Sequence, residues 1–368
     1  MTAPQSPLVL MMAGGTGGHV YPALAVATEL IDRGCRVEWI GTDRGLEARV
    51  VPEAGITLHC LVVRGVRGKN PLRKVLGILY LVLSTLQALW LVFRLSPQCV
   101  VGMGGYVAGP AGIAAWLMRK PLLIHEQNAV AGTTNRLLAP VSSKVLAGFP
   151  GAFKTDVDNT VVGNPVRREL LQRAANNDYD FAGQRPLRLL IVGGSLGAKP
   201  INELLPSVVK SIVGDDTSEV IEVWHQTGIA HLESVRESYG QLLDVGVRVT
   251  AFIEDMASAY EWADLVLCRA GALTVSELSI MGRPAILVPL PHAIDDHQTA
   301  NAHFLSDPGG GILLRQDELS VGSLRKVLES YLKYPGLLDA MAGASANLGT
   351  PGATKSVCDY CEELINDH

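Results

Sequence analysis

The sequence predicts an α/β protein made of two doubly wound domains, each built around a parallel sheet. Short apolar runs, each about the length of one buried strand, alternate with segments of helical periodicity along the chain. The stretch LRLLIVGGSLGA at 187–198 repeats the plan of LVLMMAGGTGGH at 8–19: a strand, a glycine loop and a helix start. Composition agrees, because 38 glycines and only 18% charged residues in a chain of 368 are typical of sheets covered on both faces.

The strands are expected in two series. The first series comprises Leu8–Met12, Val37–Ile40, Leu58–Val63, Cys99–Val101, Leu122–Ile124 and Lys144–Ala147. The second comprises Arg188–Val192, Val220–Trp224, Arg248–Phe252, Leu265–Cys268, Ala285–Val288 and Gly311–Leu314. Helical patterns fill the intervals, as at Ala23–Arg33 and Ser276–Met281.

A polar stretch separates the two series. Residues 164–186 contain the breaker pairs Asn-Pro, Asn-Asn and Arg-Pro, so we expect a linker there. The expected domains are therefore 1–164 and 165–344. A C-terminal helix at about 345–368 could pack on either domain and is assigned to the first.

Charge and cysteine content exclude some classes of protein. The net charge of −5 gives no global basic field, so no nucleic-acid partner is expected. Six cysteines scattered through a long chain are not a disulfide scaffold and fit a reducing cytosol. The pair Cys358 and Cys361 is interpreted as two residues of a terminal helix. The N-terminal apolar run lacks a basic n-region and enters a glycine loop, so it is interpreted as a strand and not as a signal peptide.

Three glycine-rich loops carry the strongest functional signal. They lie at 13–22, 100–110 and 192–198, each between a strand and a helix start. Glycine allows close approach of the backbone to a ligand, and the next helix offers free N–H groups, which suits a phosphate or a polar sugar. His19, at the first of these loops, is a candidate general base because histidine titrates near neutral pH; the alternative is a capping histidine.

Polar side chains also follow other strands of the expected sheets. The sequence HEQN at 125–128 ends a short apolar run, where ligands of open α/β sheets bind, although simple turn chemistry is the alternative. Glu277, early in a helix, could accept hydrogen bonds from ribose hydroxyls or merely favour the helix N-terminus. The segment DDHQTANA at 295–302 could contact sugar hydroxyls.

Metal-dependent sugar transfer and P-loop chemistry are not expected from the sequence. Asp156 and Asp158 form a DxD, a short metal-binding motif of some sugar-transferring enzymes, but they fall in a polar loop and are attributed to chance. The sequence lacks GxxxxGK[ST], so a P-loop is not expected.

The glycine loops and polar clusters together resemble the MurG family, the bacterial UDP-N-acetylglucosamine:N-acetylmuramyl-(pentapeptide) pyrophosphoryl-undecaprenol N-acetylglucosaminyltransferases that convert lipid I to lipid II. The matching stretches are AGGTGGHVYPALAVA, VVGMGGYVAGPAGIAA, HEQNAVAGTTNRLLA, GNPVR, IVGGSLGA, FIEDM, CRAGALTVSEL and DDHQTANA, in the order that the family keeps. The resemblance implies a GT-B fold, two Rossmann-like domains separated by a deep cleft. It also implies UDP-N-acetylglucosamine as donor, lipid I as acceptor and no cofactor.

The resemblance also implies roles for individual residues. The implied donor contacts are Thr16, Gly17, Gly18, Asn128, Arg167, Ser195, Ile253, Ala272, Leu273, Thr274, Val275, Ser276, Glu277 and Gln298. The implied acceptor contacts are Gly104, Gly105, Tyr106, His125 and Glu126. His297 departs from the family pattern, in which some members carry Gln, and its role stays open.

The implied reaction inverts the donor linkage and forms a β-1,4 bond. His19 is the expected base for the C4 hydroxyl of the acceptor. The departing diphosphate is expected to be stabilised by loop amides, a helix dipole and Arg167, without a metal ion.

Residues 75–93 carry no charged side chain and are about long enough to span a bilayer. A crossing there would place the glycine loops at 13–22 and 100–110 on opposite sides of the membrane, so we expect a crossover helix that is mostly core. Because the acceptor carries a polyprenyl chain, we also expect peripheral binding to the anionic, cytoplasmic face of the plasma membrane. The expected membrane residues are Arg73, Lys74, Val75, Leu76, Leu79 and Trp116, preceded by the basic residues Arg64, Arg67 and Lys69.

Three other functions remain as alternatives. A UDP-sugar epimerase of GT-B type would share fold and donor but use no lipid. A nucleotide-sensing membrane scaffold would bind UDP without turnover, and an integral membrane protein would rest on residues 75–93 alone. Partner proteins of cell-wall synthesis are also possible.

Overall fold

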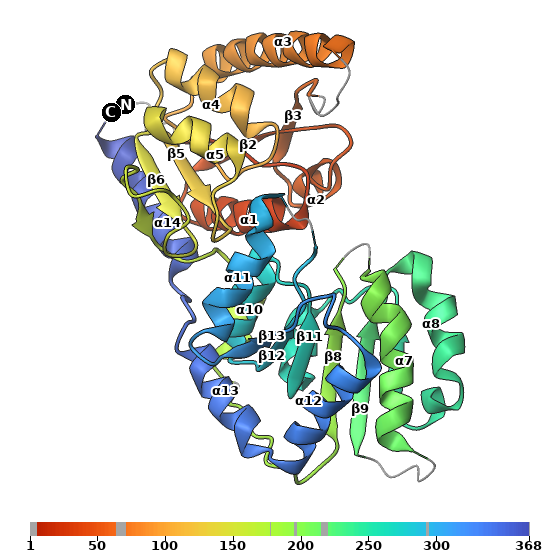
Figure 1. Cartoon of the computed structure of the whole chain (residues 1–368). Helices are drawn as coiled ribbons and strands as arrows, with labels where there is room; N and C mark the ends of the chain where they lie inside the picture. The colour runs from red at the N-terminus through yellow and green to blue at the C-terminus, as the bar shows by residue number, and fades with distance from the viewer. Residues whose placement is uncertain are drawn as a thin grey trace. The chain divides into compact units, whose positions relative to one another are not determined.

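A computed structural model describes residues 6–63, 71–176, 178–194, 197–214, 220–291 and 294–367, with only the backbone described at 71–76 and 294 (Figure 1). The expected roles of Arg64, Arg67, Lys69 and Ser195, and of the side chains of Arg73, Lys74, Val75 and Leu76, therefore lie outside the described residues. The chain forms two compact units. The first unit is Met1–Arg167 with Pro351–His368, and the second is Arg168–Thr350.

The first unit is built on a parallel sheet in the order β3-β2-β1-β4-β5-β6-β7. Its strands are β1 (Leu8–Met12), β2 (Arg36–Gly41), β3 (Thr57–Cys60), β4 (Cys99–Gly102), β5 (Leu122–Glu126), β6 (Lys144–Ala147) and β7 (Thr160–Val161). Strands β1, β4 and β5 are buried along their whole length, as expected for a sheet with helices on both faces. The chain reverses direction across the sheet between β1 and β4, which makes their carboxyl ends the switch point where α/β proteins bind ligands.

Two helical layers cover this sheet. One layer contains α1 (Gly17–Asp32) and the C-terminal helix α14 (Ala353–Asn366), which contributes Val357, Cys358 and Cys361 to the core. The other contains α3 (Pro71–Leu95), α4 (Ala108–Leu117) and α5 (Thr133–Leu138). Helix α2 (Glu47–Glu53) follows β2.

The second unit repeats the plan with a sheet in the order β10-β9-β8-β11-β12-β13. Its strands are β8 (Leu187–Val192), β9 (Ile221–Gln226), β10 (Val247–Thr250), β11 (Leu265–Cys268), β12 (Ala285–Leu287) and β13 (Gly311–Leu313). Its helices are α6 (Arg168–Ala174), α7 (Lys199–Val213), α8 (Leu232–Tyr239), α9 (Met256–Trp262), α10 (Ala272–Met281), α11 (His297–Ser306), α12 (Val321–Lys333) and α13 (Gly336–Ala346). The switch point here lies between β8 and β11.

Most of the expected strands are present, and the differences have local causes. Strand β7 was not predicted, because it is two residues long and pairs only with the end of β6. The segment predicted as a linker contains helix α6, whose Leu170 is 1% exposed and packs into the second unit beside α9 and α10.

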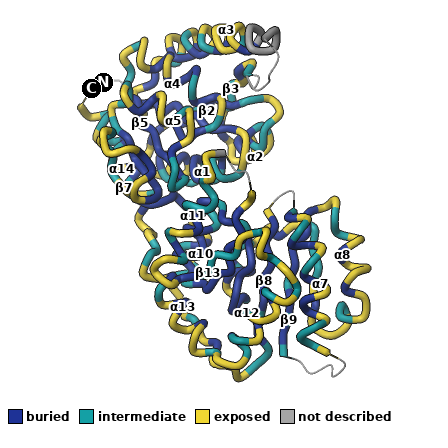
Figure 2. The backbone as a smooth tube through the Cα atoms, viewed as in Figure 1, coloured by how far each residue is buried: buried dark blue, intermediate teal, exposed yellow. Residues whose placement is uncertain are grey.

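Helix α3 corrects the expectation that residues 75–93 are mostly core. Only 22% of its apolar window Gly77–Leu95 is buried, although by length and composition that window could cross a membrane. A single stripe faces inward, formed by Gly77, Ser84, Ala88, Leu91 and Val92. The opposite face is apolar yet exposed over several turns, as the yellow segments of α3 show in Figure 2. Its residues, here called the α3 outer face, are Leu79, Val82, Leu83, Leu86, Trp90 and Phe93, with exposed fractions between 45% and 72%.

Candidate functional site

In the first unit, the candidate site lies at the carboxyl ends of β1, β4 and β5. The glycine loops after β1 and β4 touch each other through their backbones. Gly105 has φ +86°, and a Cβ on it would overlap the carbonyl oxygen of Gly14. Gly104 has φ +96°, and a Cβ there would lie 2.9 Å from Nδ1 of His19. These glycines are needed because only hydrogen fits between the two loops and against the imidazole.

His19 lies in the first turn of α1 and contacts a residue that follows β5. Its Nδ1 lies 2.9 Å from Oε1 of Gln127. Nε2 of Gln127 lies 3.2 Å from Nδ1 of His125, and Nε2 of His125 lies 2.9 Å from the carbonyl oxygen of Gly163. Burial lowers the pKa of His125 to about 4, so its ring is neutral at pH 7. A continuous polar chain therefore runs from the sheet interior to His19.

Glu126 supports the loop after β5. Its side chain is 2% exposed. One carboxylate oxygen accepts hydrogen bonds from the backbone and side-chain N–H groups of Asn128, at 2.9 and 3.0 Å. The other accepts from the Gly132 N–H at 3.0 Å and from the Asn135 amide at 2.8 Å. With His125 fully buried as well, both side chains lie in the interior, behind the loop that they shape.

Glu47 is a buried carboxylate that sequence reasoning missed. Its Oε2 accepts a hydrogen bond from the Gly15 N–H at 3.0 Å. Its Oε1 accepts from the Thr42 N–H at 3.1 Å and from the Thr42 hydroxyl at 2.7 Å. Nothing in the sequence marked this residue, but three glycines make room for its side chain. A Cβ on Gly14 would lie 2.7 Å from Oε1 of Glu47, and a Cβ on Gly41 or Gly45 would also overlap that side chain. Glu47 thus anchors the loop that precedes His19.

Other expected residues of the first unit are accessible. Thr16 is exposed and makes no capping hydrogen bond with its side chain. Gly17, Gly18 and Asn128 are half-buried, and Tyr106 is 56% exposed. The half-buried Arg167 places its guanidinium 5.6 Å from the centre of the Tyr21 ring.

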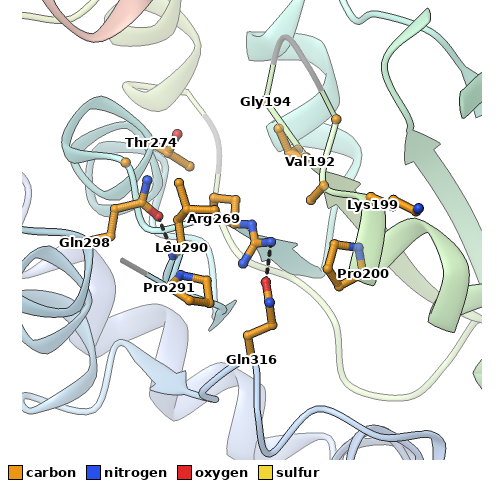
Figure 3. Close-up of a pocket in the computed structure, with 14 residues that line it drawn as sticks. Val192, Gly194, Lys199, Pro200, Arg269, Thr274, Leu290, Pro291, Gln298 and Gln316 are labelled. Carbon is orange, nitrogen blue, oxygen red and sulfur yellow. Dashed lines mark hydrogen bonds between the residues drawn. The ribbon is translucent and has the colours of Figure 1, made fainter. Parts of the chain in front are cut away.

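The second unit contains a cavity of about 660 Å³ at the carboxyl ends of β8 and β11 (Figure 3). It is lined by Val192, Gly193, Gly194, Gly197, Ala198, Lys199, Pro200, Arg269, Gly271, Thr274, Leu290, Pro291, Gln298 and Gln316. The lining includes residues at the starts of three helices, so three helix N-termini meet at one cavity: Lys199 and Pro200 of α7, Gly271 and Thr274 at α10, and Gln298 of α11. Their free N–H groups and positive dipole ends make it suited to an anionic ligand.

Arg269 is a cavity residue that sequence reasoning did not single out. Its Nη1 donates to the carbonyl oxygens of Val288 and Pro289, both at 3.1 Å. Its Nη2 donates to Oε1 of Gln316 at 2.7 Å, as Figure 3 shows. Burial lowers its pKa from the usual value for arginine. The guanidinium is thereby fixed in the wall of the cavity.

Gln298 lines the same cavity, and its Oε1 accepts a hydrogen bond from the Leu290 N–H at 2.9 Å (Figure 3). A Cβ on Gly193 would lie 2.6 Å from the Ala198 nitrogen, which explains glycine at the start of the loop that contains Ser195.

The residues expected along α10 differ in accessibility. Leu273 and Thr274 are half-buried, and Thr274 lines the cavity. Ala272, Val275, Ser276 and Glu277 are buried, and the Ser276 hydroxyl donates to the carbonyl oxygen of Ala272. Glu277 accepts a hydrogen bond from the Tyr260 hydroxyl at 3.1 Å. Ile253, in the loop after β10, is 4% exposed.

Asp156 and Asp158 lie elsewhere. Both line a separate cavity of about 440 Å³ in the first unit, beside residues 142–145 at the amino end of β6. Both side chains are exposed. Across the described ranges, no three His, Cys, Asp or Glu side chains are grouped so that they could hold a metal ion.

Comparison with known proteins connects the two units to one family. The glycosyltransferase family 28 N-terminal domain matches residues 9–147, and the family 28 C-terminal domain matches residues 188–357. The chain is 49% identical to the UDP-N-acetylglucosamine–N-acetylmuramyl-(pentapeptide) pyrophosphoryl-undecaprenol N-acetylglucosamine transferase of Pseudomonas putida W619, over 97% of this chain and 98% of that protein.

Solved structures agree. The crystal structure of Acinetobacter baumannii MurG matches with a TM-score of 0.81 and 39% identity, covering 97% of this chain and 99% of that one. A putative UDP-N-acetylglucosamine 2-epimerase from Listeria monocytogenes matches with a TM-score of 0.67 over 99% of this chain and 98% of that one. At 15% identity this second likeness concerns the fold alone. The fold is GT-B, with a Rossmann-type sheet in each unit.

Proposed function

The chain belongs to glycosyltransferase family 28, and we propose that it transfers N-acetylglucosamine from UDP-N-acetylglucosamine to lipid I, giving lipid II for peptidoglycan synthesis. The observation that carries this proposal is near full-length identity of 49% to a transferase whose name states that reaction. The architecture supports it, since each unit offers one switch-point site with glycine loops, as a two-substrate transferase needs.

The second unit binds the donor. Its cavity of about 660 Å³ brings three helix N-termini together with the fixed cation of Arg269, and this combination suits the diphosphate of a nucleotide sugar. Thr274 and Gln298 line the cavity directly. Glu277 and the backbone of Ile253 remain the proposed contacts for ribose and uracil, and Ser195 is proposed for the diphosphate.

The side chains of Val275 and Ser276 are buried, so their proposed donor contacts depend on the backbone of α10. The other proposed donor contacts come from the family resemblance. They are Thr16, Gly17, Gly18, Asn128, Arg167, Ala272 and Leu273.

The first unit binds the acceptor and supplies the base. Gly104, Gly105 and Tyr106 form the loop beside His19, where the acceptor pyrophosphate is proposed to lie. His19 removes the proton of the C4 hydroxyl as that oxygen attacks C1 of N-acetylglucosamine. The bond from C1 to the diphosphate oxygen breaks, UDP leaves with the electron pair, and the α linkage becomes β-1,4.

In this mechanism helix N-termini and the guanidinium groups of Arg167 and Arg269 stabilise the negative charge that develops on the leaving UDP, without a metal ion. Activity should therefore survive treatment with EDTA. Loss of activity that a divalent ion restores would contradict metal-independent chemistry.

The first unit also binds the membrane surface through the α3 outer face. Leu79 is 53% exposed on α3, and Trp116 is 51% exposed on α4, which packs against α3. A continuous exposed apolar face of this kind on one helix suits the bilayer interface, where the polyprenyl chain of the acceptor is anchored. The proposed location is the cytoplasmic face of the plasma membrane, where cell-wall synthesis proteins are possible partners.

Binding to anionic liposomes tests the membrane proposal. The double substitution Leu79→Glu/Leu86→Glu should release the protein from liposomes while the fold is kept. Ile31→Glu is the matched control, because Ile31 is 43% exposed on α1, in the other helical layer. Unchanged binding of a folded Leu79→Glu/Leu86→Glu protein would exclude this face.

The reaction itself is tested with labelled UDP-N-acetylglucosamine and a short-chain lipid I analogue. The expected products are free UDP and a lengthened lipid. UDP-N-acetylmannosamine without a lipid product would instead support an epimerase, and binding of UDP without turnover would support a nucleotide-sensing scaffold.

A further inference from the structure

The polar chain from Gly163 to His19 determines where the protons lie on each of its members. A carbonyl oxygen can only accept a hydrogen bond, so Nε2 of His125, 2.9 Å from the carbonyl oxygen of Gly163, must carry a proton. His125 is fully buried and neutral, so its Nδ1 is then unprotonated and can only accept.

The side-chain amide of Gln127 is oriented by two acceptors. Its Nε2 lies 3.2 Å from Nδ1 of His125 and 3.3 Å from the backbone carbonyl oxygen of His125. The NH₂ group must point at this pair, since the reverse orientation would place the amide oxygen against two acceptors. The Asn164 amide also donates to the Gln127 carbonyl oxygen at 3.0 Å and holds the backbone in place.

The amide oxygen of Gln127 consequently faces His19. Oε1 lies 2.9 Å from Nδ1 of His19 and can only accept, so Nδ1 of His19 carries the proton. Nε2 of a neutral His19 is then the atom with the free lone pair. Gly104 allows this arrangement, because any Cβ at that position would lie 2.9 Å from Nδ1 of His19 and disturb the contact.

We infer that Gln127 and His125 are positioning residues that hold His19 in the Nδ1–H tautomer and so make Nε2 the atom that takes the acceptor proton. This inference rests on the proposed function for the identity of the proton donor. The arrangement places a neutral amide where many hydrolases place a carboxylate against the catalytic histidine. It orients the ring and sets its tautomer without placing a negative charge beside it.

The tautomer can be measured without activity. Protein labelled with ¹⁵N-histidine reports by NMR which ring nitrogen of each histidine is protonated, and the His19→Gln variant identifies the His19 signals by their absence. In the unsubstituted protein at a pH where His19 is neutral, Nδ1 should be protonated and Nε2 should not. A protonated Nε2 and bare Nδ1 would overturn the inference, whether or not the lipid substrate is right.

Two substitutions of Gln127 separate positioning from packing. Gln127→Met keeps the length of the side chain but offers Nδ1 only a weak thioether acceptor and gives His125 no donor. The Nδ1–H preference should therefore be largely lost and kcat should fall by about 10-fold to 100-fold, with the KM for UDP-N-acetylglucosamine within about 3-fold of its original value. Gln127→Glu keeps an acceptor for Nδ1 of His19, and its second oxygen faces the two acceptors of His125, so this buried carboxyl should hold a proton there and donate in place of the amide. It should therefore restore the tautomer and part of kcat. Failure of Gln127→Glu to exceed Gln127→Met would count against the inference.

Gln98→Met is the matched control. Oε1 of Gln98 also accepts a hydrogen bond in the first unit, from the Leu8 N–H, but at the amino end of the sheet. The Gln98→Met substitution should leave the His19 tautomer and kcat unchanged. Equal loss of kcat in the Gln98→Met and Gln127→Met proteins, or an unchanged kcat and tautomer in Gln127→Met, would refute a positioning role.

Discussion

Replacing Glu47 by glutamine should loosen the first glycine loop and can be analysed hydrogen bond by hydrogen bond. Oε1 accepts from both the N–H and the hydroxyl of Thr42, so the new side chain is expected to keep its oxygen there. Its NH₂ group would then face the Gly15 N–H, which Oε2 now accepts at 3.0 Å, so two donors would oppose each other in a fully buried site.

The expected loss of stability follows from the hydrogen bond that Glu47→Gln removes. One hydrogen bond to a charged acceptor is worth about 1.5–3 kcal/mol, and an unsatisfied buried donor costs about 1–3 kcal/mol, so Glu47→Gln should destabilise the first unit by roughly 2.5–6 kcal/mol. For a unit of this size, that lowers the midpoint of thermal unfolding by roughly 5–24 °C. Turnover should fall more than donor affinity, because the loop leads into α1 and His19.

Thermal unfolding and steady-state kinetics, measured on the same preparations, test this reasoning. Thr42→Val is the comparison, because it removes the hydroxyl that donates to Glu47 at 2.7 Å and accepts from the Gly45 N–H at 3.1 Å, but leaves the Gly15 anchor intact. Its loss of stability should be of the same order, while its kcat should stay near the original. A Glu47→Gln protein that melts within about 1 °C of the original and turns over normally would refute the claim that Glu47 holds this loop.

Three further outcomes are expected. Gly105→Ala, at φ +86° and in contact with the Gly14 carbonyl, should lower kcat with the lipid acceptor at least about 10-fold while UDP binding, measured by calorimetry, is retained. Asp264→Ala should destabilise the second unit by about 1.5–3 kcal/mol in denaturant melts, because Arg185 loses its buried partner and keeps the exposed Asp180, and unchanged melts would contradict this. Burial lowers the pKa of His125 to about 4 from 6.5, so the unfolded chain takes up this proton at a higher pH than the folded one. The stability of the first unit should therefore fall as pH drops from about 6.5 to about 4 and then level off. Melting curves at pH 7, 5.5 and 4.5 that coincide would argue against a buried neutral ring.

Sequence patterns located the strands well where burial on both faces leaves an uninterrupted apolar run. β1 and β11 match their expected bounds for that reason, and β6 matches although it begins with the half-buried Lys144. Helix α6 was hidden by the polar breakers around it, since only Leu170 signals a buried face. Helix α3 was misjudged because apolar length says nothing about which face is covered, and only its neighbours in space reveal the exposed side.

The glycine loops and His19 of the candidate site could be predicted from the sequence, but the residues that hold them in place could not. The glycine loops and His19 stand out because a ligand approaches backbone there. Glu47 and Gln127 carry no such mark, since a glutamate at a helix start and a glutamine after a strand are ordinary surface residues in most sequences. Their roles appear only when residues 32 and 108 positions apart in the chain are brought within hydrogen-bond distance.

The position of helix α14 at the end of the chain affects the order in which the two units fold during translation. The first unit is synthesised first, yet Val357, Cys358 and Cys361 of its core arrive only after the entire second unit has emerged. The second unit is continuous in sequence and can complete its core earlier. We therefore expect the order of folding on the ribosome to be the reverse of the order of synthesis, with the unit that carries His19 left open to chaperones and proteases until residues 353–366 dock against α1.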